Sequence, residues 1–453
     1  MDDWLTASAA ALGRGIGAGE IDPVALTEAY LAAIDAHEFT PRIYARLTAD
    51  RARAEAAAAA ARATAGTRRG PLDGVPISWK DLFDTAGVAT EGGSALLAGR
   101  VPSRDARVLR HATDAGLVCL GKTHMTELAF SGLGLNPVTQ SPPNVNDHGA
   151  VSGGSSSGAA TSVAFGLAAA GIGSDTGGSV RNPSAWNDLV GLKTRHGRLS
   201  LDGVLPLCAR FDTVGPLART VEDAALLFAA LGGAQTDLAG ARLDDVHLAD
   251  LKTLATDNLR DGPRAAHRSA VERLRAAGAR VTEIDVPAVA EAMALAGQLF
   301  APEAFGTWKD AIEAAPEKMH PPVRERFRSG AATSGPDFVA AWQTLDRLRA
   351  DYAAATAGFD AVVLPTVPSL PPSQVAVTED EALFVAENLL ALQNTRIGNL
   401  MGLAGLTLPT GVPSSGIMFQ GPSEERLLRI GAAAEAALAK KPHPAGLRRI
   451  FGI

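Results

Sequence analysis

The chain has 453 residues, of which 46% are hydrophobic and 20% are charged, and its formal net charge is −7. This balance is typical of a folded protein with an ample core, and the acidic surplus argues against direct binding to nucleic acid. The two cysteines, Cys119 and Cys208, are too few for a disulfide framework. No stretch reaches the roughly 20 uninterrupted apolar residues of a membrane helix, and the acidic first residues do not resemble a signal peptide. We therefore expect a cytoplasmic enzyme or binding protein with no membrane segment.

Residues 1–66 are expected to form helices that pack against the rest of the chain. Asp22 and Pro23 supply a cap and a first-turn proline for one of them. Residues 52–65 are almost wholly alanine with interspersed Arg and Glu, a composition with the highest helix propensity available. We interpret this tract as a surface helix rather than a linker.

Residues 67–235 alternate between short apolar runs and segments of helical periodicity. The runs 75–79 and 117–120 are bounded by glycines and predict buried strands, whereas 106–115 and 220–231 predict helices. This alternation is typical of an α/β fold. We expect a central mixed, largely parallel, twisted sheet covered by helices on both faces.

The second half of the chain is expected to leave the sheet and return to it. Residues 240–358 are predicted to be a mostly helical insertion, with one strand at 280–285 and a long helix at 338–355. Residues 359–453 return to the core through strands at 359–366 and 406–409. A compressed strand pair follows at 414–421, and a helix at 424–441 closes the fold. The whole chain, 1–453, is thus predicted to be a single domain.

Two turns rich in glycine and serine, 153–158 and 175–179, carry the clearest chemical signal. An apolar stretch between them predicts one short helix and one strand, so the turns lie at opposite ends of a compact unit. Glycine lets a backbone approach a reacting group closely. Serine supplies a nucleophile, and successive backbone N–H groups supply an oxyanion site. The pattern indicates acyl transfer.

Two motif matches point elsewhere. Residues 116–123 match the phosphate-binding expression G-x-x-x-x-G-K-[ST], but the intervening Leu-Val-Cys-Leu resembles a strand rather than a loop. Residues 154–158 match the nucleophile elbow of α/β-hydrolases, with Ser156 as nucleophile. That fold needs a histidine in a loop after a core strand, and no later histidine has such a setting. The elbow also leaves the second turn without a role.

A serine nucleophile without a histidine needs another base. Lys80 ends the apolar run 75–79, so its side chain is placed to project from the edge of a sheet. Burial lowers the pKa of a lysine because it disfavours the ammonium form. The pattern alone is also that of an ordinary solvated lysine at the end of a strand.

Taken together, these segments resemble the amidase signature family over residues 5–440. The resemblance rests on 71–81, 121–123, 153–158, 175–184, 190–194, 212–220 and 364–366. It implies a Ser–cis-Ser–Lys triad of Ser179 as nucleophile, Ser155 as the cis serine and Lys80 as base. The backbone N–H groups of Thr176, Gly177, Gly178 and Ser179 would form the oxyanion hole. Ser156, Asp175 and Arg181 match supporting positions, and no metal or organic cofactor is called for.

The same resemblance implies an amide hydrolase acting on carbon–nitrogen bonds other than peptide bonds, with a small-molecule amide as substrate. Ala129 and Ser131 are expected to line the substrate pocket. Arg396 would either bind a substrate carboxylate or form a structural ion pair. The leading function is a stand-alone amidase. The alternatives are the glutaminase (A-type) subunit of a glutamyl-tRNA(Gln) amidotransferase, or a silent binding protein, against which the intact triad argues. The resemblance also allows a homodimer.

Two departures from the family pattern stand out. The region after residue 413 is shorter than is usual in the family. Trp186, Asn187 and Asp188 occupy positions where small or apolar residues are common. We expect these three residues to alter the packing behind the second turn or the wall of the site.

Overall fold

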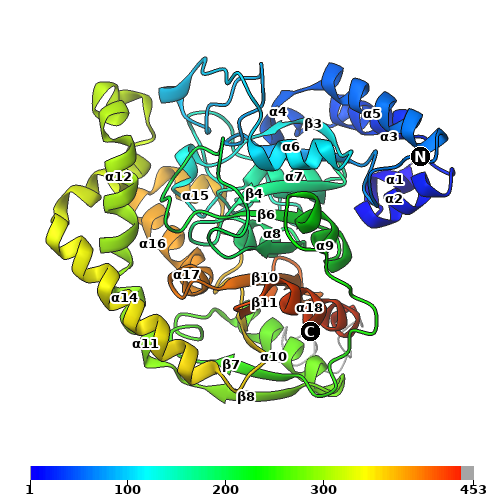
Figure 1. The fold of residues 1–453 in the computed structure, drawn as a ribbon. Helices are drawn as coiled ribbons and strands as arrows, with labels where there is room; N and C mark the ends of the chain where they lie inside the picture. The colour runs from blue at the N-terminus through cyan, green and yellow to red at the C-terminus, as the bar shows by residue number, and fades with distance from the viewer. Residues whose placement is uncertain (1, 440–453) are drawn as a thin grey trace.

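The structure, a computed structural model, describes residues 2–439; residues 1 and 440–453 lie outside the described part. Its strands form one eleven-stranded sheet in the order β1-β3-β2-β4-β6-β5-β10-β11-β9-β7-β8 (Figure 1). The strands are β1 (Tyr44–Leu47), β2 (Pro76–Lys80), β3 (Val118–Thr123), β4 (Ala170–Ser174), β5 (Val190–Lys193), β6 (Val214–Ala218), β7 (His247–Leu251), β8 (Arg280–Ile284), β9 (Ala361–Pro365), β10 (Ala404–Pro409) and β11 (Gly416–Gly421).

Eighteen α-helices accompany the sheet among residues 2–439. The first nine are α1 (Asp2–Thr6), α2 (Ala9–Gly17), α3 (Pro23–Ala36), α4 (Thr40–Ile43), α5 (Ala49–Thr64), α6 (Arg107–Asp114), α7 (Ser157–Ala164), α8 (Arg181–Trp186) and α9 (Val221–Ala230). The others are α10 (Asp261–Ala276), α11 (Pro287–Ala294), α12 (Ala296–Ala314), α13 (Pro321–Arg328), α14 (Gly335–Thr356), α15 (Gln374–Glu379), α16 (Glu381–Ala391), α17 (Gln393–Leu400) and α18 (Glu424–Leu438). None of the described helices is long and apolar enough to cross a membrane.

The predicted mixed sheet is confirmed, but the expectation that it is largely parallel is wrong. Of the ten strand pairings among the described residues, six are antiparallel. The parallel pairings join β2 to β3 and β4, and β7 to β8 and β9. Apolar periodicity does not encode strand direction, and a short connection such as the one between β10 and β11 produces an antiparallel hairpin.

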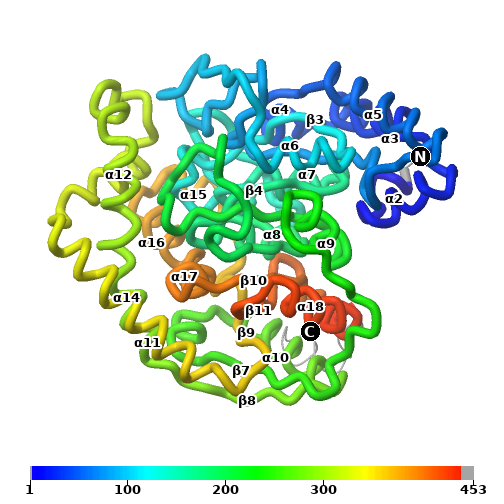
Figure 2. Tube along the Cα trace, viewed as in Figure 1, coloured from blue at the N-terminus to red at the C-terminus, as the bar shows by residue number. Residues whose placement is uncertain are grey.

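Helices cover both faces of the sheet, as neighbouring residues of β10 illustrate. Leu406 packs toward Gly431 of α18, whereas Thr407 packs toward Gly191 and Gly416 beside α8. Successive side chains of a strand point to opposite faces, so α18 and α8 lie on opposite sides. Figure 2 shows the orange and red C-terminal segment running between the cyan and green core strands and β7 with β8.

Most locally encoded elements lie where the sequence predicts them. Asp22 caps α3 by accepting from the Val24 N–H, and Pro23 stands in its first turn. The phosphate-loop lookalike is strand β3, which carries Lys122 as a buried partner of Asp81. The compressed strand pair expected at 414–421 is instead a single strand, β11, which pairs with β10 and β9 inside the sheet. The closing helix α18 ends at Leu438, and the predicted extension to 440 and 441 lies outside the described residues.

Two strands lie in stretches that the sequence predicts to be helical. β1 lies within the N-terminal segment predicted to be helical, and β7 lies within the segment predicted to hold a single strand. Their sequences, YARL and HLADL, carry charged residues that interrupt the apolar signal. In β7 the buried Asp250 is satisfied by His267 of α10, whose Nε2 lies 2.9 Å from Asp250 Oδ1. Tertiary partners therefore make these strands stable where the sequence pattern alone is weak.

Candidate active site

Lys80 lies at the end of β2, a strand whose five residues are all buried. Its Nζ is 2.7 Å from Ser155 Oγ and 2.8 Å from Ser174 Oγ. Ser174 ends the adjacent parallel strand β4, so the sheet itself brings these side chains together. Burial lowers the pKa of Lys80 to about 7, against the opposing pull of the Asp175 and Asp212 charges. A substantial fraction of Lys80 is therefore a neutral amine near pH 7.

Ser155 belongs to the first glycine-serine turn, which precedes α7. The Gly154–Ser155 peptide bond is cis. The preceding backbone is fixed by bonds from Gly153 N to Leu133 O at 2.9 Å and from Gly154 N to Gly132 O at 2.7 Å. Gly153 has a φ of 80°, and a Cβ there would lie 2.9 Å from Asn182 Oδ1. This position needs glycine for both its conformation and its close packing.

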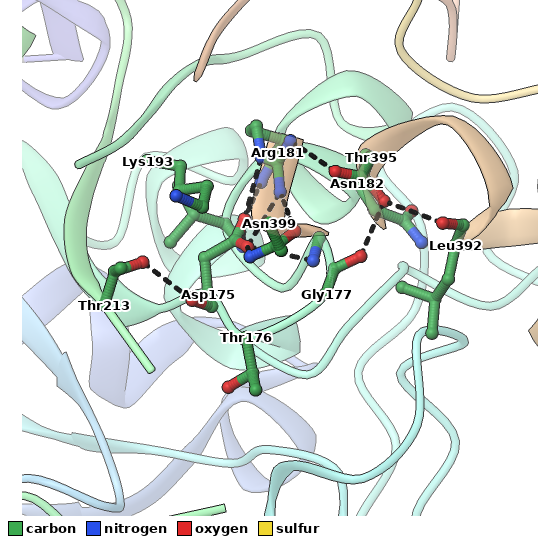
Figure 3. A network of polar contacts seen from close by, with 12 residues as sticks. Asp175, Thr176, Gly177, Arg181, Asn182, Lys193, Thr213, Leu392, Thr395 and Asn399 are labelled. Atoms are coloured by element: carbon green, nitrogen blue, oxygen red, sulfur yellow. Dashed lines mark hydrogen bonds and ion pairs between the residues drawn. The ribbon is translucent and has the colours of Figure 1, made fainter. Parts of the chain in front are cut away.

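The second turn is held by a buried ion pair between Asp175 and Arg181 (Figure 3). Arg181 Nε donates to Asp175 Oδ2 at 3.0 Å and Arg181 Nη2 donates to Asp175 Oδ1 at 2.8 Å. Burial acts to raise the pKa of Asp175, but the Arg181 charge and hydrogen bonds outweigh it and hold that pKa well below its usual range. Asn399 of α17 also donates to Asp175, at 2.9 Å. The turn thus has the charge-assisted support expected at Asp175 and Arg181.

The backbone N–H groups of this turn are not equivalent. The Gly178 N–H donates to Asp175 Oδ1 at 2.9 Å. It is therefore not available as an oxyanion donor, although it was one of the four expected. Those of Thr176, Gly177 and Ser179 have no hydrogen-bond partner among residues 2–439. Thr395 Oγ1 of α17 donates to the Gly177 carbonyl at 2.8 Å and fixes the plane of that peptide (Figure 3). Three donors therefore remain available beside the Ser179 side chain.

Asp212 supports the same turn from outside it. Thr176 Oγ1 donates to Asp212 Oδ1 at 2.5 Å, and the Leu207 N–H donates to Asp212 Oδ2 at 2.9 Å. Burial raises the pKa of Asp212 to about 6, and these hydrogen bonds act in the opposite direction. The carboxylate anchors the Thr176 side chain and so orients the N-terminal part of the turn.

Ser156 links the two turns through its hydroxyl and its backbone N–H. Its Oγ donates to the Ser174 carbonyl at 3.2 Å and accepts from the Ser174 N–H at 3.3 Å, and its N–H donates to the Ser179 carbonyl at 3.2 Å. With its hydroxyl occupied by backbone, Ser156 has the geometry of a support. The α/β-hydrolase alternative, which made Ser156 the nucleophile, is therefore not supported.

Ser179 opens into a small cavity of about 20 Å³, here called the Ser179 cavity. Its polar lining includes Thr176, Ser131, Arg326 and Arg396. Its apolar lining includes Ala129, Phe130, Phe300 and Leu392. Ala129, Ser131 and Arg396, the three residues expected around the substrate, thus lie around one space with Ser179.

Of the expected triad, Lys80 and Ser155 are joined by a hydrogen bond, and Ser179 is not joined to them. Among residues 2–439 the Ser179 hydroxyl has no hydrogen-bond partner, so it does not contact Ser155 Oγ directly. Catalytic hydrogen bonds often tighten only when substrate is bound. The structure therefore brings Lys80 to Ser155 and leaves the Ser179 hydroxyl free.

The Amidase family model matches residues 25–425, most of the chain. The chain belongs to the Amidase family. It is accordingly an amide hydrolase of the amidase signature type, and the mixed sheet with helices on both sides is the architecture of that family.

The names of individual relatives and solved structures describe different activities. The chain is 35% identical to 2-amino-5-chloromuconic acid deaminase from Comamonas testosteroni, across 88% of this chain and 90% of the relative. It is 33% identical to the A-type subunit of glutamyl-tRNA(Gln) amidotransferase from Anaeromyxobacter sp. (strain K), across 95% and 96%. Among solved structures, the peptide amidase from Stenotrophomonas maltophilia is 30% identical, with a TM-score of 0.79 and coverage of 96% and 98%.

Three residues at the site were not singled out from the sequence. Ser174 directly precedes Asp175, and that adjacency to the second turn was the one available signal. Asp212 lies in 212–220, one of the segments on which the family resemblance rests, but no role was predicted for it. Arg326 lies in α13, far along the chain from both turns, and only the tertiary structure brings it to the Ser179 cavity. The unusual Trp186 packs against the first turn, where a Cβ on Gly153 would lie 2.9 Å from Trp186 Cε3, and its Nε1 donates to the Ser369 carbonyl at 2.9 Å.

Proposed function

We propose that this protein hydrolyses a carboxylic amide to a carboxylate and ammonia or an amine through an acyl-enzyme on Ser179. The observation that carries the proposal is the buried Lys80 amine, 2.7 Å from Ser155 Oγ, with a pKa lowered to about 7. A neutral amine can accept a proton at physiological pH, which an ordinary lysine cannot do. The free N–H groups of Thr176, Gly177 and Ser179 supply the complementary oxyanion site.

Acylation would proceed by attack of Ser179 Oγ on the amide carbonyl carbon. The Ser179 proton passes to Ser155 Oγ as the Ser155 proton passes to Lys80 Nζ, so one proton in total reaches the lysine. The carbonyl oxygen becomes an oxyanion that accepts from the free backbone donors. Each such donor contributes about 2.7–4 kcal/mol of transition-state stabilisation in comparable sites.

Collapse of the tetrahedral intermediate breaks the carbon–nitrogen bond. The proton returns from Lys80 through Ser155 to the departing nitrogen, which leaves as ammonia or an amine, and Ser179 remains esterified. Water then attacks the ester and gives its proton to the same relay. Departure of Ser179 Oγ, reprotonated by the relay, releases the carboxylic acid and restores the starting state.

Ser174 would orient the base in this scheme. A neutral amine has one lone pair, and the Ser174 hydroxyl accepts one of its N–H groups at 2.8 Å. That bond turns the lone pair toward Ser155. Ser174 is therefore a positioning residue, acting through Lys80.

A glutaminase role is the second candidate, because several relatives, at 31–33% identity, are A-type subunits of glutamyl-tRNA(Gln) amidotransferases. Such a protein would release ammonia from glutamine and pass it on within a complex. A stand-alone amidase would instead hydrolyse other amides without a partner. The two candidates share the same acylation chemistry and differ in substrate and in dependence on a partner.

Ammonia release by the purified chain tests the proposal. The substrates are glutamine, phenylacetamide and malonamate, and Ser179→Ala is assayed beside the wild type. We expect ammonia from at least one non-glutamine amide, with a loss of about 10⁴-fold or more in Ser179→Ala and unchanged thermal unfolding. Strict preference for glutamine with dependence on a partner would favour the glutaminase. Retained activity in Ser179→Ala would exclude Ser179 as the nucleophile.

A further inference from the structure

Two arginines line the Ser179 cavity without an acidic partner. Arg326 of α13 and Arg396 of α17 form no ion pair among residues 2–439. Their neighbours do: on α13, Arg324 pairs with Glu325 at 2.8 Å and Arg328 pairs with Glu313 at 2.8 Å. The expectation of a structural ion pair at Arg396 is therefore wrong for the described chain. Both arginines line the same cavity as Ser179.

Aromatic rings and backbone hold these guanidinium groups without neutralising them. The Arg326 guanidinium lies 4.3 Å from the centroid of the Phe130 ring, and its Nη1 donates to the Phe130 carbonyl at 2.9 Å. The Arg396 guanidinium lies 5.9 Å from the Phe300 centroid, and its one hydrogen-bond partner among residues 2–439 is Met293 Sδ at 3.9 Å. An arginine has five N–H donors, so most of those on both residues have no acceptor in the described chain.

The arrangement is electrostatically unfavourable without an anion. Burial lowers the pKa of Arg326 to about 9, with a further contribution from the charge of Arg396, and burial lowers that of Arg396 to about 10. Two cations that repel each other in a partly dry cavity are costly unless a counter-charge enters. A carboxylate accepts parallel N–H bonds from a guanidinium and matches its planar fork.

The position of Arg396 limits where that carboxylate can be. A Cβ built on Gly177 would lie 3.9 Å from Arg396 Nε, so this guanidinium sits next to the backbone that supplies the oxyanion donors. An anion bound there is close to the carbonyl under attack. Because Arg396 lies next to Gly177, a short acyl chain between the apolar walls Phe130, Phe300 and Leu392 suffices to join the carboxylate to the scissile carbonyl.

We propose that Arg326 and Arg396 select an amide whose acyl part carries a carboxylate a few atoms from the scissile carbonyl, that is, the monoamide of a short dicarboxylic acid. This proposal rests on the proposed amidase function. The carboxylate pairs with the two guanidinium groups, and Ser179 attacks the amide end of the same molecule. Neutral amides lack that pairing and leave both cations unsatisfied.

Matched pairs of substrates test the selection. Values of kcat/KM are measured for malonamate against malonamide and for succinamate against succinamide, which differ only by carboxylate and carboxamide. We expect the wild type to prefer the anionic member of at least one pair by about 10- to 100-fold, the range given by charged hydrogen bonds. Arg396→Gln and Arg326→Gln should each reduce that ratio about 10-fold. The ratio of Arg396→Lys should lie between those of the wild type and Arg396→Gln, because lysine keeps the charge but lacks the planar guanidinium group.

Arg260→Gln is the control variant. Arg260 lines a neighbouring outer cavity of about 650 Å³ with Arg396, but it pairs with Glu387 and does not line the Ser179 cavity. The kcat/KM ratio of Arg260→Gln should match that of the wild type. A match distinguishes direct binding of the carboxylate from a general effect of positive charge near the site. Equal or better turnover of the neutral amides by the wild type would overturn the proposal, and so would an unchanged ratio in Arg396→Gln. If Arg396→Gln does not fold, the kcat/KM ratios of the wild type and of Arg396→Lys still test the proposal.

Failure of the proposed amidase function would give a different result from failure of the proposed arginine site. No ammonia from any amide would remove the amidase, yet anion binding could still be measured. Calorimetric titration of Ser179→Ala with malonate and succinate should show binding, and the dissociation constant should rise about 10-fold or more in Ser179→Ala with Arg396→Gln. Failure of both dicarboxylates to bind Ser179→Ala, or equal binding in the double variant, would contradict the arginine site itself.

Discussion

At the scale of single residues, the activity of the site depends on one buried amine. Lys80 must be neutral to accept a proton, and its pKa is lowered to about 7. We therefore expect kcat/KM for an uncharged amide to rise with pH through about 7 and then level off, because the ammonium form predominates below that value. A pH–rate profile checks this expectation.

Asp212 provides the control for that profile, because its pKa is raised to about 6 and it contacts the same turn through Thr176. Asp212→Asn removes a titration near pH 6 and also removes a charge that raises the pKa of Lys80, so the rising limb should remain and move to lower pH. A profile in which kcat/KM falls as the pH rises through 7 would contradict a lysine base.

The hydroxyl of Ser174 makes a second prediction at this scale. Ser174→Ala removes an acceptor from Lys80 and should lower kcat/KM about 10-fold, the effect of one hydrogen bond. The same hydroxyl also stabilises the ammonium form, so its loss should shift the pH–rate limb to lower pH. Ser174→Thr should restore both properties. Ser162→Ala is the matched control, because Ser162 is a buried serine that bonds Ser78 Oγ at 2.7 Å rather than Lys80. If the rising limb of the pH–rate profile stays at the same pH in Ser174→Ala, Ser174 does not act on Lys80 and contributes only to packing.

At the scale of elements, the second turn and α8 depend on the pair of Asp175 and Arg181. Asp175→Ala leaves the buried Arg181 uncompensated and should lower the free energy of unfolding by about 3–5 kcal/mol. Chemical denaturation measures the loss. Glu222→Gln breaks the exposed pair with Arg14, at 2.6 Å, and should cost less than about 1 kcal/mol. If Asp175→Ala is as stable as Glu222→Gln, the ion pair does not hold the turn.

The elements also show which features the sequence could predict. β2 and β3 each include a short, mostly apolar run and α3 has a local cap, so short-range patterns were sufficient to predict them. β7 depends on the contact between Asp250 and His267, which are distant in sequence, and the pattern alone did not reveal it. Strand direction was also predicted wrongly, because it depends on how the chain returns to the sheet rather than on composition.

At the scale of the whole molecule, the site combines segments from across the chain. Lys80 and Ser174 meet because β2 and β4 are neighbours. The motif residues Ser155 and Ser179 were predictable, since the two turns are short and recognisable. Arg326 was not, because it comes from a helix in the region expected to be an insertion, and no local pattern distinguishes it from its paired neighbours on α13.

Covalent labelling tests the central claim most directly. The purified chain, without any partner, is treated with a fluorophosphonate that mimics the acyl step, and the modified peptide is mapped by mass spectrometry. The account predicts one adduct, on Ser179, formed faster as Lys80 loses its proton above pH 7 and absent in Ser179→Ala. An adduct on Ser155 or Ser156, or undiminished labelling of Ser179→Ala, would contradict it.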